Sequence, residues 1–283
     1  MSVLETTGEM GHLKKVGNVS LDGTKVLANA SKHSAVSYEH AGKVAAREER
    51  QAAGRRAGRE PKPPQETPLP KDQYNFTDPE SRIMKAGTGG HFAQTYHAQS
   101  VVDAEGSMLI LGTSVCAAPN DKEQLVPGVA SVEAGARQVE AVRVDNGFYS
   151  EQAVVQVEAA REDGCPAPVV SAAMKRESRH RSVADLAGRP EPEPLLEGAS
   201  IRQRMEHRLA TAAGRELYKL RKQTVELVFG IIKEVMGFRR FSLRGKAKAN
   251  LEWLLVCAAD NVKRLHRLVQ NALAGETLSV PAA

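Results

Sequence analysis

Cysteine and aromatic residues are scarce in this chain of 283 residues. It has only three cysteines, Cys116, Cys165 and Cys257, and Phe, Trp and Tyr together make up 4% of the sequence. The cysteines lie far apart and form neither a Cys-x-x-Cys pair nor a Cys/His metal spacing, which argues against a disulfide framework and against structural zinc. The simplest interpretation is buried free thiols in a reducing cytoplasm.

Long apolar runs are also missing. No stretch approaches the roughly 18 apolar residues of a membrane span, and residues 1–9 lack the basic and then apolar pattern of a secretion signal. The sequence therefore predicts a cytoplasmic protein with no membrane partner. Charged residues make up 26% of the sequence, and the formal net charge is +5. This net charge suits an anionic partner, although an ordinary solvated surface would also account for it.

The pattern of apolar residues predicts alternating strands and helices. Strands are expected at residues 16–24, 139–144 and 166–172, together with a β-hairpin at 92–116. Helices are expected to begin near Asn120-Asp121 and at 150, 201 and 248, and the helix from 201 to 236 should break near Gly214. This order indicates an α/β fold with an antiparallel hairpin in its sheet.

A charged insertion interrupts the pattern after the first strand. Residues 37–73 contain five arginines and a proline-rich piece but few large apolar side chains. We therefore expect a charged helix and an extended linker, loosely attached to the core. The predicted organisation has five parts: residues 1–36 with the first strand, the insertion 37–73, a core at 74–174, a linker at 175–200 and C-terminal helices at 201–275.

One predicted helix carries the most chemical information. At 100° per residue, its polar stripe comprises Tyr218, Lys222, Glu226, Phe229 and Lys233. The opposite, apolar stripe comprises Leu217, Leu220, Leu227, Val228, Ile231, Ile232 and Val235. A carboxylate among basic and aromatic groups can hold a divalent cation beside phosphates, which favours metal-assisted chemistry on a phosphodiester backbone.

Two aspartates lie at the ends of predicted strands, where functional groups collect in open α/β sheets. Asp22 and Asp145 each also have a simple explanation as turn residues, because Asp-Gly and Asn-Gly turns are common. Glu226 and Lys222 would likewise make an ordinary surface ion pair. Two other carboxylates compete with them: Asp103 is interpreted as a hairpin residue and Asp121 as a helix-start residue, and either could lie near a metal.

Three segments, in this order, resemble bacterial insertion-sequence transposases of the DDE class. Residues 21–31 are similar to the first-aspartate strand of that family, and residues 142–151 to its second-aspartate strand and turn. Residues 218–233 are similar to the helix that carries a tyrosine, a basic residue, the catalytic glutamate and a lysine seven residues later. The resemblance covers most of residues 12–270. It implies an RNase H-like fold, a mixed sheet flanked by helices.

The resemblance also implies the chemistry. The expected catalytic and metal-ligating residues are Asp22, Asp145 and Glu226, and the expected DNA-binding residues are Tyr218, Arg221, Lys222 and Lys233. The implied cofactor is a pair of Mg²⁺ ions, with Mn²⁺ as an alternative, since carboxylates suit hard cations. The implied activity is cleavage of DNA at transposon ends and strand transfer into target DNA, carried out by a homo-oligomer.

The sequence departs from the pattern of the family at several points. Phe148 stands where a tyrosine is usual and Leu227 where proline is frequent, but neither change removes an expected ligand. Members normally carry a helical DNA-end-binding region before the first aspartate, whereas about twenty residues precede Asp22 here. We therefore expect an N-terminally truncated transposase. The alternative is a non-catalytic DNA-binding remnant, and the DNA upstream of the Met1 codon would distinguish the two.

Overall fold

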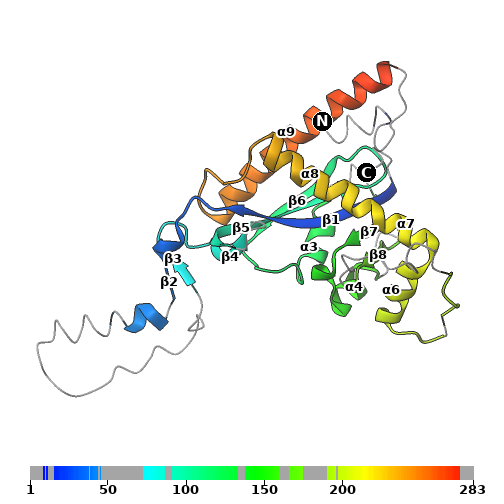
Figure 1. Cartoon of the computed structure of the whole chain (residues 1–283), viewed down its shortest axis with the longest axis horizontal. Coiled ribbons are helices and arrows are strands. Elements are labelled where there is room, and N and C mark those ends of the chain that lie inside the picture. Colours follow the sequence, from blue (N-terminus) through cyan, green and yellow to red (C-terminus); the bar gives the residue numbers. More distant parts are fainter. Residues whose placement is uncertain are drawn as a thin grey trace, which may run out of the picture.

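A six-stranded mixed sheet with helices on both faces forms the centre of the computed structural model (Figure 1). The structure describes residues 16–37, 39–43, 73–86, 91–132, 138–159, 166–174, 190–195 and 197–274, with residues 9, 11 and 45. The strands of the sheet are β1 (Val16–Leu27), β4 (Arg82–Ala86), β5 (His91–Asp103), β6 (Ile110–Cys116), β7 (Gln138–Val144) and β8 (Val169–Ala172). The predicted α/β class, with a mixed sheet flanked by helices, is confirmed.

Strand β1 lies in the middle of this sheet. It pairs antiparallel with β5 on one side and parallel with β7 on the other, and β7 pairs parallel with β8. The other edge of β5 pairs antiparallel with β4 along one half and with β6 along the other. The predicted strands of Asp22 and Asp145 are therefore neighbours in one sheet.

Side-chain alternation along β1 separates two cores. Val19 and Leu21 belong to the first core, whereas Val26 and Ala28 belong to the second. The first core lies under α3 (Leu125–Ala130), α4 (Glu151–Val157) and α6 (Ile201–Ala210), and the second lies under the helices after residue 221. Since Asp22 has the same parity as Val26, its side chain faces the C-terminal helices.

The longest helix, α9 (Lys246–Leu273), holds the hairpin in place through buried polar contacts. The Trp253 indole N–H donates to the carbonyl of Gln99 at 3.0 Å. The Asn261 amide both donates to the Ile110 carbonyl and accepts from the Ile110 N–H, each at 2.8 Å. The two Asn261 bonds fall at the register shift between β5 and β6, where Leu111 has no partner in the strand pairing. Asn261 therefore satisfies backbone groups beside a β-bulge.

The predicted helix 201–236 is divided, but at Thr211 rather than near Gly214. Thr211 has extended backbone angles between α6 and α7 (Ala212–Arg221), and its hydroxyl accepts from the Gly214 N–H at 3.0 Å. Gly214 lies inside α7, where a Cβ atom would collide with the Arg208 carbonyl. The glycine thus permits a close approach of two helices, while the threonine makes the break.

The helix after α7 contains two π-helical segments. The first, η3 (Lys222–Glu226), leads into α8 (Leu227–Gly230), and the second is η4 (Ile231–Val235). A π-helical turn has hydrogen bonds to the fifth residue instead of the fourth, so it contains an extra residue and rotates the helix face that follows. This rotation changes which residues face the sheet.

The ends of the charged insertion are described, but most of it is not. Strands β2 (Ala35–Ser37) and β3 (Gln73–Asn75) pair antiparallel and bring the two ends of the segment together. The expectation of a loosely attached charged helix and linker falls mainly on residues outside the described ones, as does much of the linker 175–200. The five-part division stays a prediction.

Two further predictions concern the cysteines and the membrane. Cys257 is a buried free thiol and Cys116 a half-buried one, whereas Cys165 lies outside the described residues. Burial raises the pKa of the Cys257 thiol to about 12. Within the part of the chain that the structure describes, no helix has the length and apolar character needed to cross a membrane.

Candidate active site

Asp22 and Asp145 lie side by side because their strands are paired. The parallel register aligns Ser20 of β1 with Arg143 of β7, so continuing it by two residues aligns Asp22 with Asp145. Strand β7 ends at Val144, and Asp145 is the first residue after it. The two carboxylates thus meet at the carboxyl end of β7, the position where ligands bind in sheets of this kind.

Glu226 reaches the same point from the C-terminal helix, and a π-helical turn makes this possible. Arg221 and Glu226 are five residues apart, yet Arg221 Nη2 lies 3.2 Å from Glu226 Oε1. In an α-helix, residues five apart point about 140° away from each other around the axis. Segment η3 lies between the two residues and turns both toward the sheet.

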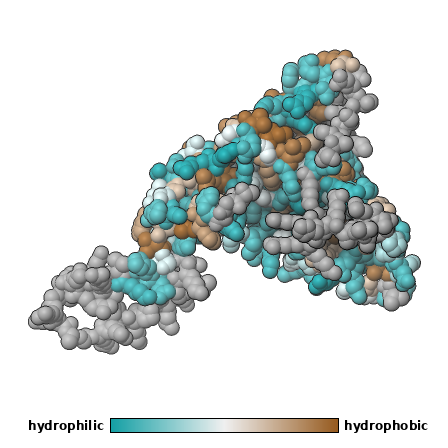
Figure 2. Space-filling view, viewed as in Figure 1, coloured by the Kyte–Doolittle hydropathy of each residue, from teal (hydrophilic) through white to brown (hydrophobic). Residues whose placement is uncertain are grey.

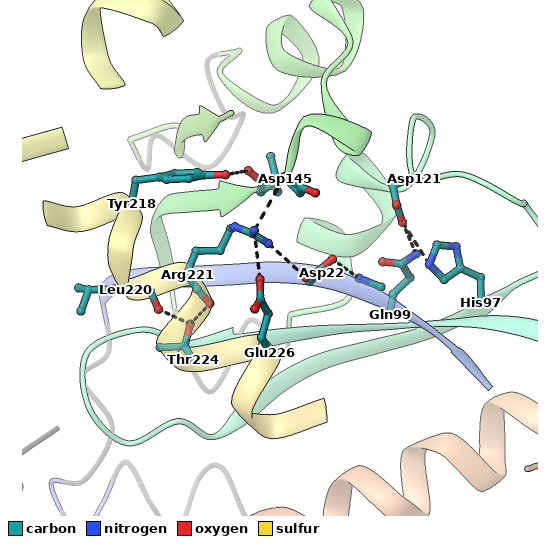
Figure 3. A network of polar contacts seen from close by, with 12 residues as sticks. Asp22, His97, Gln99, Asp121, Asp145, Tyr218, Leu220, Arg221, Thr224 and Glu226 are labelled. Carbon is teal, nitrogen blue, oxygen red and sulfur yellow. Dashed lines mark hydrogen bonds and ion pairs between the residues drawn. The ribbon is translucent and has the colours of Figure 1, made fainter. Parts of the chain in front are cut away.

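The Arg221 guanidinium lies at the centre of the three carboxylates (Figure 3). Its Nη1 is 3.2 Å from Asp22 Oδ2, and its Nη2 is 3.8 Å from Asp145 Oδ1 as well as 3.2 Å from Glu226 Oε1. The Arg221 side chain is only 6% exposed and that of Asp22 19%, whereas those of Asp145 and Glu226 are about half exposed. The site therefore has a buried floor and an open rim.

The surroundings of Asp22 disfavour its charged form. Burial raises the pKa of this carboxyl from 3.8 to about 7, and the nearby charges of Asp121 and Asp145 act in the same direction. The Arg221 guanidinium and the Gly23 N–H, which donates to Asp22 Oδ1 at 2.8 Å, only partly offset this effect. Asp22 is therefore a carboxylate that a further positive charge would stabilise.

The predicted stripes of this helix are partly wrong. Leu217, Leu227 and Val235 were expected to be buried, but they are 44%, 44% and 71% exposed, while Phe229 from the expected polar stripe is buried. The face that packs on the sheet is instead made of Arg221, Thr224, Val225, Val228, Phe229 and Ile232. The cause is the extra residue in each π-helical turn, which a uniform 100° per residue does not include.

Two of the candidate DNA-binding side chains, Tyr218 and Lys233, form hydrogen bonds with strands β7 and β1. The Tyr218 hydroxyl donates to the Val144 carbonyl at 3.4 Å, and the Arg221 guanidinium lies 5.6 Å from the centre of the Tyr218 ring. Lys233 donates to the Thr24 hydroxyl and, at 3.0 Å, to a carbonyl of β1, and its burial lowers the pKa of the amine. The side chain of Lys222 lies outside the described residues.

Asp121 belongs to a polar cluster beside the site. The predicted helix start at Asn120-Asp121 is wrong, because α3 begins at Leu125. Asp121 Oδ1 instead accepts from Gln99 Nε2 at 3.1 Å and lies 3.3 Å from His97 Nε2. The sequence alone leaves open whether Asp121 lies near a metal, because no residue spacing predicts its position. Asp103, as expected, is a hairpin residue: it is the last residue of β5 and accepts from the Ser107 N–H and hydroxyl.

This cluster packs on the glycines that follow the two aspartates. A Cβ at Gly23 would collide with His97 and lie 2.6 Å from Gln99 Nε2. A Cβ at Gly147 would lie 3.1 Å from Asp121 Oδ2. The two glycines therefore allow a close approach of side chains beside both aspartates. Asp145 follows the end of β7, as predicted, whereas Asp22 lies within β1, which continues to Leu27, and not at the end of its strand.

The chemistry of the donor set fits a hard divalent cation. Three carboxylates from distant segments supply only oxygen ligands, as Mg²⁺ and Mn²⁺ require. As they stand, the described residues contain no group of three or more His, Cys, Asp and Glu side chains arranged to hold a metal ion. In Figure 3 the Arg221 guanidinium lies between the carboxylates, where it supplies a positive charge.

Comparison with known proteins identifies the C-terminal part of this site. Residues 192–266 match a family model described as a transposase DDE domain, and the match includes Arg221 and Glu226. Neither the curated proteins nor the solved structures gave a match to the chain. The matched region contains α6, α7, η3, α8, η4 and most of α9. Residues 192–266 are thus similar to the DDE domain of transposases.

Proposed function

We propose that this chain is the catalytic domain of a DDE transposase, which cleaves DNA and transfers the cut strand with the help of divalent metal ions. The observation that carries the proposal is the meeting of Asp22, Asp145 and Glu226 around one guanidinium, although they are far apart in the sequence. Turn residues and surface ion pairs have no reason to converge in this way. The mixed sheet, with its hairpin next to β1, supports an RNase H-like fold.

Each carboxylate has its own part in the proposed site. Asp22 is fixed at the floor by the Gly23 N–H and by the sheet, and Asp145 and Glu226 form the rim that DNA would reach. Mg²⁺ or Mn²⁺, if bound there, would activate a water or a 3′-hydroxyl of the DNA as the nucleophile and would stabilise the leaving oxygen. Tyr218, Arg221, Lys222 and Lys233 then lie along the helix that would border the DNA backbone, where cations contact phosphates.

A surface stripe supports the proposal that the active form is a homo-oligomer. Figure 2 shows apolar side chains gathered over α9. The exposed members of this stripe are Leu251, Leu254, Leu255 and Val262, each at least half exposed. Contiguous apolar patches on a protein surface can mark protein–protein interaction sites.

The decisive experiment is cleavage of DNA that carries the gene and its flanking sequences. We expect cleavage with Mg²⁺, none with a chelator, and none from the Glu226→Gln protein, because the amide cannot supply an anionic ligand. Circular dichroism should be unchanged, since the Glu226 side chain is about half exposed and outside the core. Glu216→Gln, which removes an exposed acid from α7, is the matched control and should cleave normally. Full cleavage by Glu226→Gln would overturn the proposed mechanism.

A further inference from the structure

Arg221 occupies the place that a cation would need. Its guanidinium contacts Asp22, Asp145 and Glu226 at 3.2, 3.8 and 3.2 Å, so it lies within reach of an oxygen from each carboxylate. A divalent ion that binds the same oxygens would stand next to a nearly fully buried positive charge. Like charges at this separation repel strongly where water is scarce, so the two cations exclude each other.

The contacts of Arg221 are suited to exchange. Its Nε atom is buried and has no hydrogen-bond partner among the described residues, so the guanidinium is held by ion pairs on one side only. Two of its three partners, Asp145 and Glu226, lie at the exposed rim. Arg221 is also the last residue before η3, and π-helical turns are found where helices serve a functional site.

A DNA phosphate is the group best able to draw the guanidinium away. The forked N–H groups of arginine bind a phosphate with two parallel hydrogen bonds, and this geometry is as favourable as that with a carboxylate. The Tyr218 ring, 5.6 Å from the guanidinium, offers a surface along which the side chain can move outward. Moving to a phosphate would leave three carboxylates facing each other, which is the arrangement that a divalent cation stabilises.

We propose that Arg221 is a gate that fills the cation position in the DNA-free chain and leaves it for a backbone phosphate, so that DNA and divalent cation bind with positive coupling. The inference rests on the proposed function, because it assumes that the three carboxylates hold the metal. By linkage, each ligand raises the affinity for the other by the same factor, and such factors typically lie between about 5 and 150. The metal would then bind weakly to the DNA-free chain and much more tightly when DNA is present.

The test measures Mn²⁺ binding rather than cleavage, by the loss of the electron paramagnetic resonance signal of free Mn²⁺. Wild-type protein should bind Mn²⁺ weakly alone and about 5-fold to 150-fold more tightly when a short duplex of arbitrary sequence is added. Arg221→Gln should bind tightly without DNA and gain little from it. Arg221→Lys keeps a charge but cannot reach three carboxylates at once. Its Mn²⁺ affinity without DNA should therefore lie between those of wild type and Arg221→Gln. This variant provides the test if the glutamine variant does not fold.

Two controls separate this proposal from the function on which it rests. Arg208→Gln removes an arginine from a partly buried pair with Glu158 outside the site, and it should leave Mn²⁺ binding unchanged. Asp22→Asn and Glu226→Gln should both weaken Mn²⁺ binding; if neither does, the proposed metal site is wrong. If they do, but the Arg221 variants bind Mn²⁺ no more tightly than wild type without DNA, the gate is wrong and the metal site stands.

Discussion

Replacing Asp22 with asparagine should make the folded protein more stable, even though it removes a residue of the candidate active site. Burial raises the pKa of this carboxyl from 3.8 to about 7, and that value already includes the attraction of Arg221. A change of this size corresponds to roughly 4 kcal/mol of unfavourable free energy once the group is fully ionised. Asparagine is neutral at every pH and avoids this cost.

The gain should depend on pH in a defined way. Below about pH 4, Asp22 is protonated in both the folded and the unfolded chain, and the substitution should change little. Between pH 4 and pH 7 the unfolded chain loses the proton while the folded chain keeps it, so wild-type stability falls as the pH rises. The gain from Asp22→Asn should therefore be roughly 2 kcal/mol at pH 5 and up to about 4 kcal/mol at pH 8.

Urea unfolding of both proteins from pH 5 to pH 8, without divalent cations, measures this difference directly. Comparing the two proteins at each pH cancels the titration of all other groups. Glu216→Gln, an exposed control, should change stability by less than about 1 kcal/mol. Equal stability of wild type and Asp22→Asn at pH 8, or a gain independent of pH, would refute the reasoning. Added Mg²⁺ should stabilise the wild type selectively, because it binds only the folded site.

Three further predictions follow from single contacts. Gly23→Ala should cost about 1–3 kcal/mol of folding stability by urea unfolding, because the methyl group collides with His97. Asn261→Ala should cost about 2–4 kcal/mol in the same assay, since both backbone groups of Ile110 lose their partner in a buried position. Lys233→Met should weaken DNA binding and flatten its salt dependence by about one phosphate, measured by fluorescence anisotropy; an unchanged slope would exclude a phosphate contact.

Most of the sheet was predictable because its strands either alternate apolar with polar residues or are continuously apolar. The strand at residues 16–24, the hairpin and the strand at 139–144 all appear in the structure near their predicted bounds, as β1, β5, β6 and β7. Strand β4 was missed, since Arg82–Ala86 is short, contains two basic residues and lies at the edge of the sheet. The parallel pairing of β1 with β7, on which the meeting of Asp22 and Asp145 depends, follows from the α/β order.

The arrangement of the C-terminal helix could not be read from residue spacing. Nothing in the composition of residues 222–226 indicates a π-helical turn. In a regular α-helix the basic partner of Glu226 would be Lys222, four positions earlier. The turn instead brings in Arg221, which the family resemblance suggested only as a DNA-binding residue. The polar cluster of Asp121 was hidden for another reason: its packing on Gly23 is a contact between segments far apart in sequence.

The central claim is that Asp22, Asp145 and Glu226 hold one metal cluster, and metal-directed cleavage of the polypeptide tests it most directly. Fe²⁺ can replace Mg²⁺ at oxygen ligands, and with ascorbate and peroxide it cuts the backbone next to where it is bound. We predict cuts near residues 22, 145 and 226, suppressed by excess Mg²⁺, and stronger in the Arg221→Gln protein than in the wild type. Cuts confined to other segments, or cuts at these positions that Mg²⁺ does not suppress, would contradict the account.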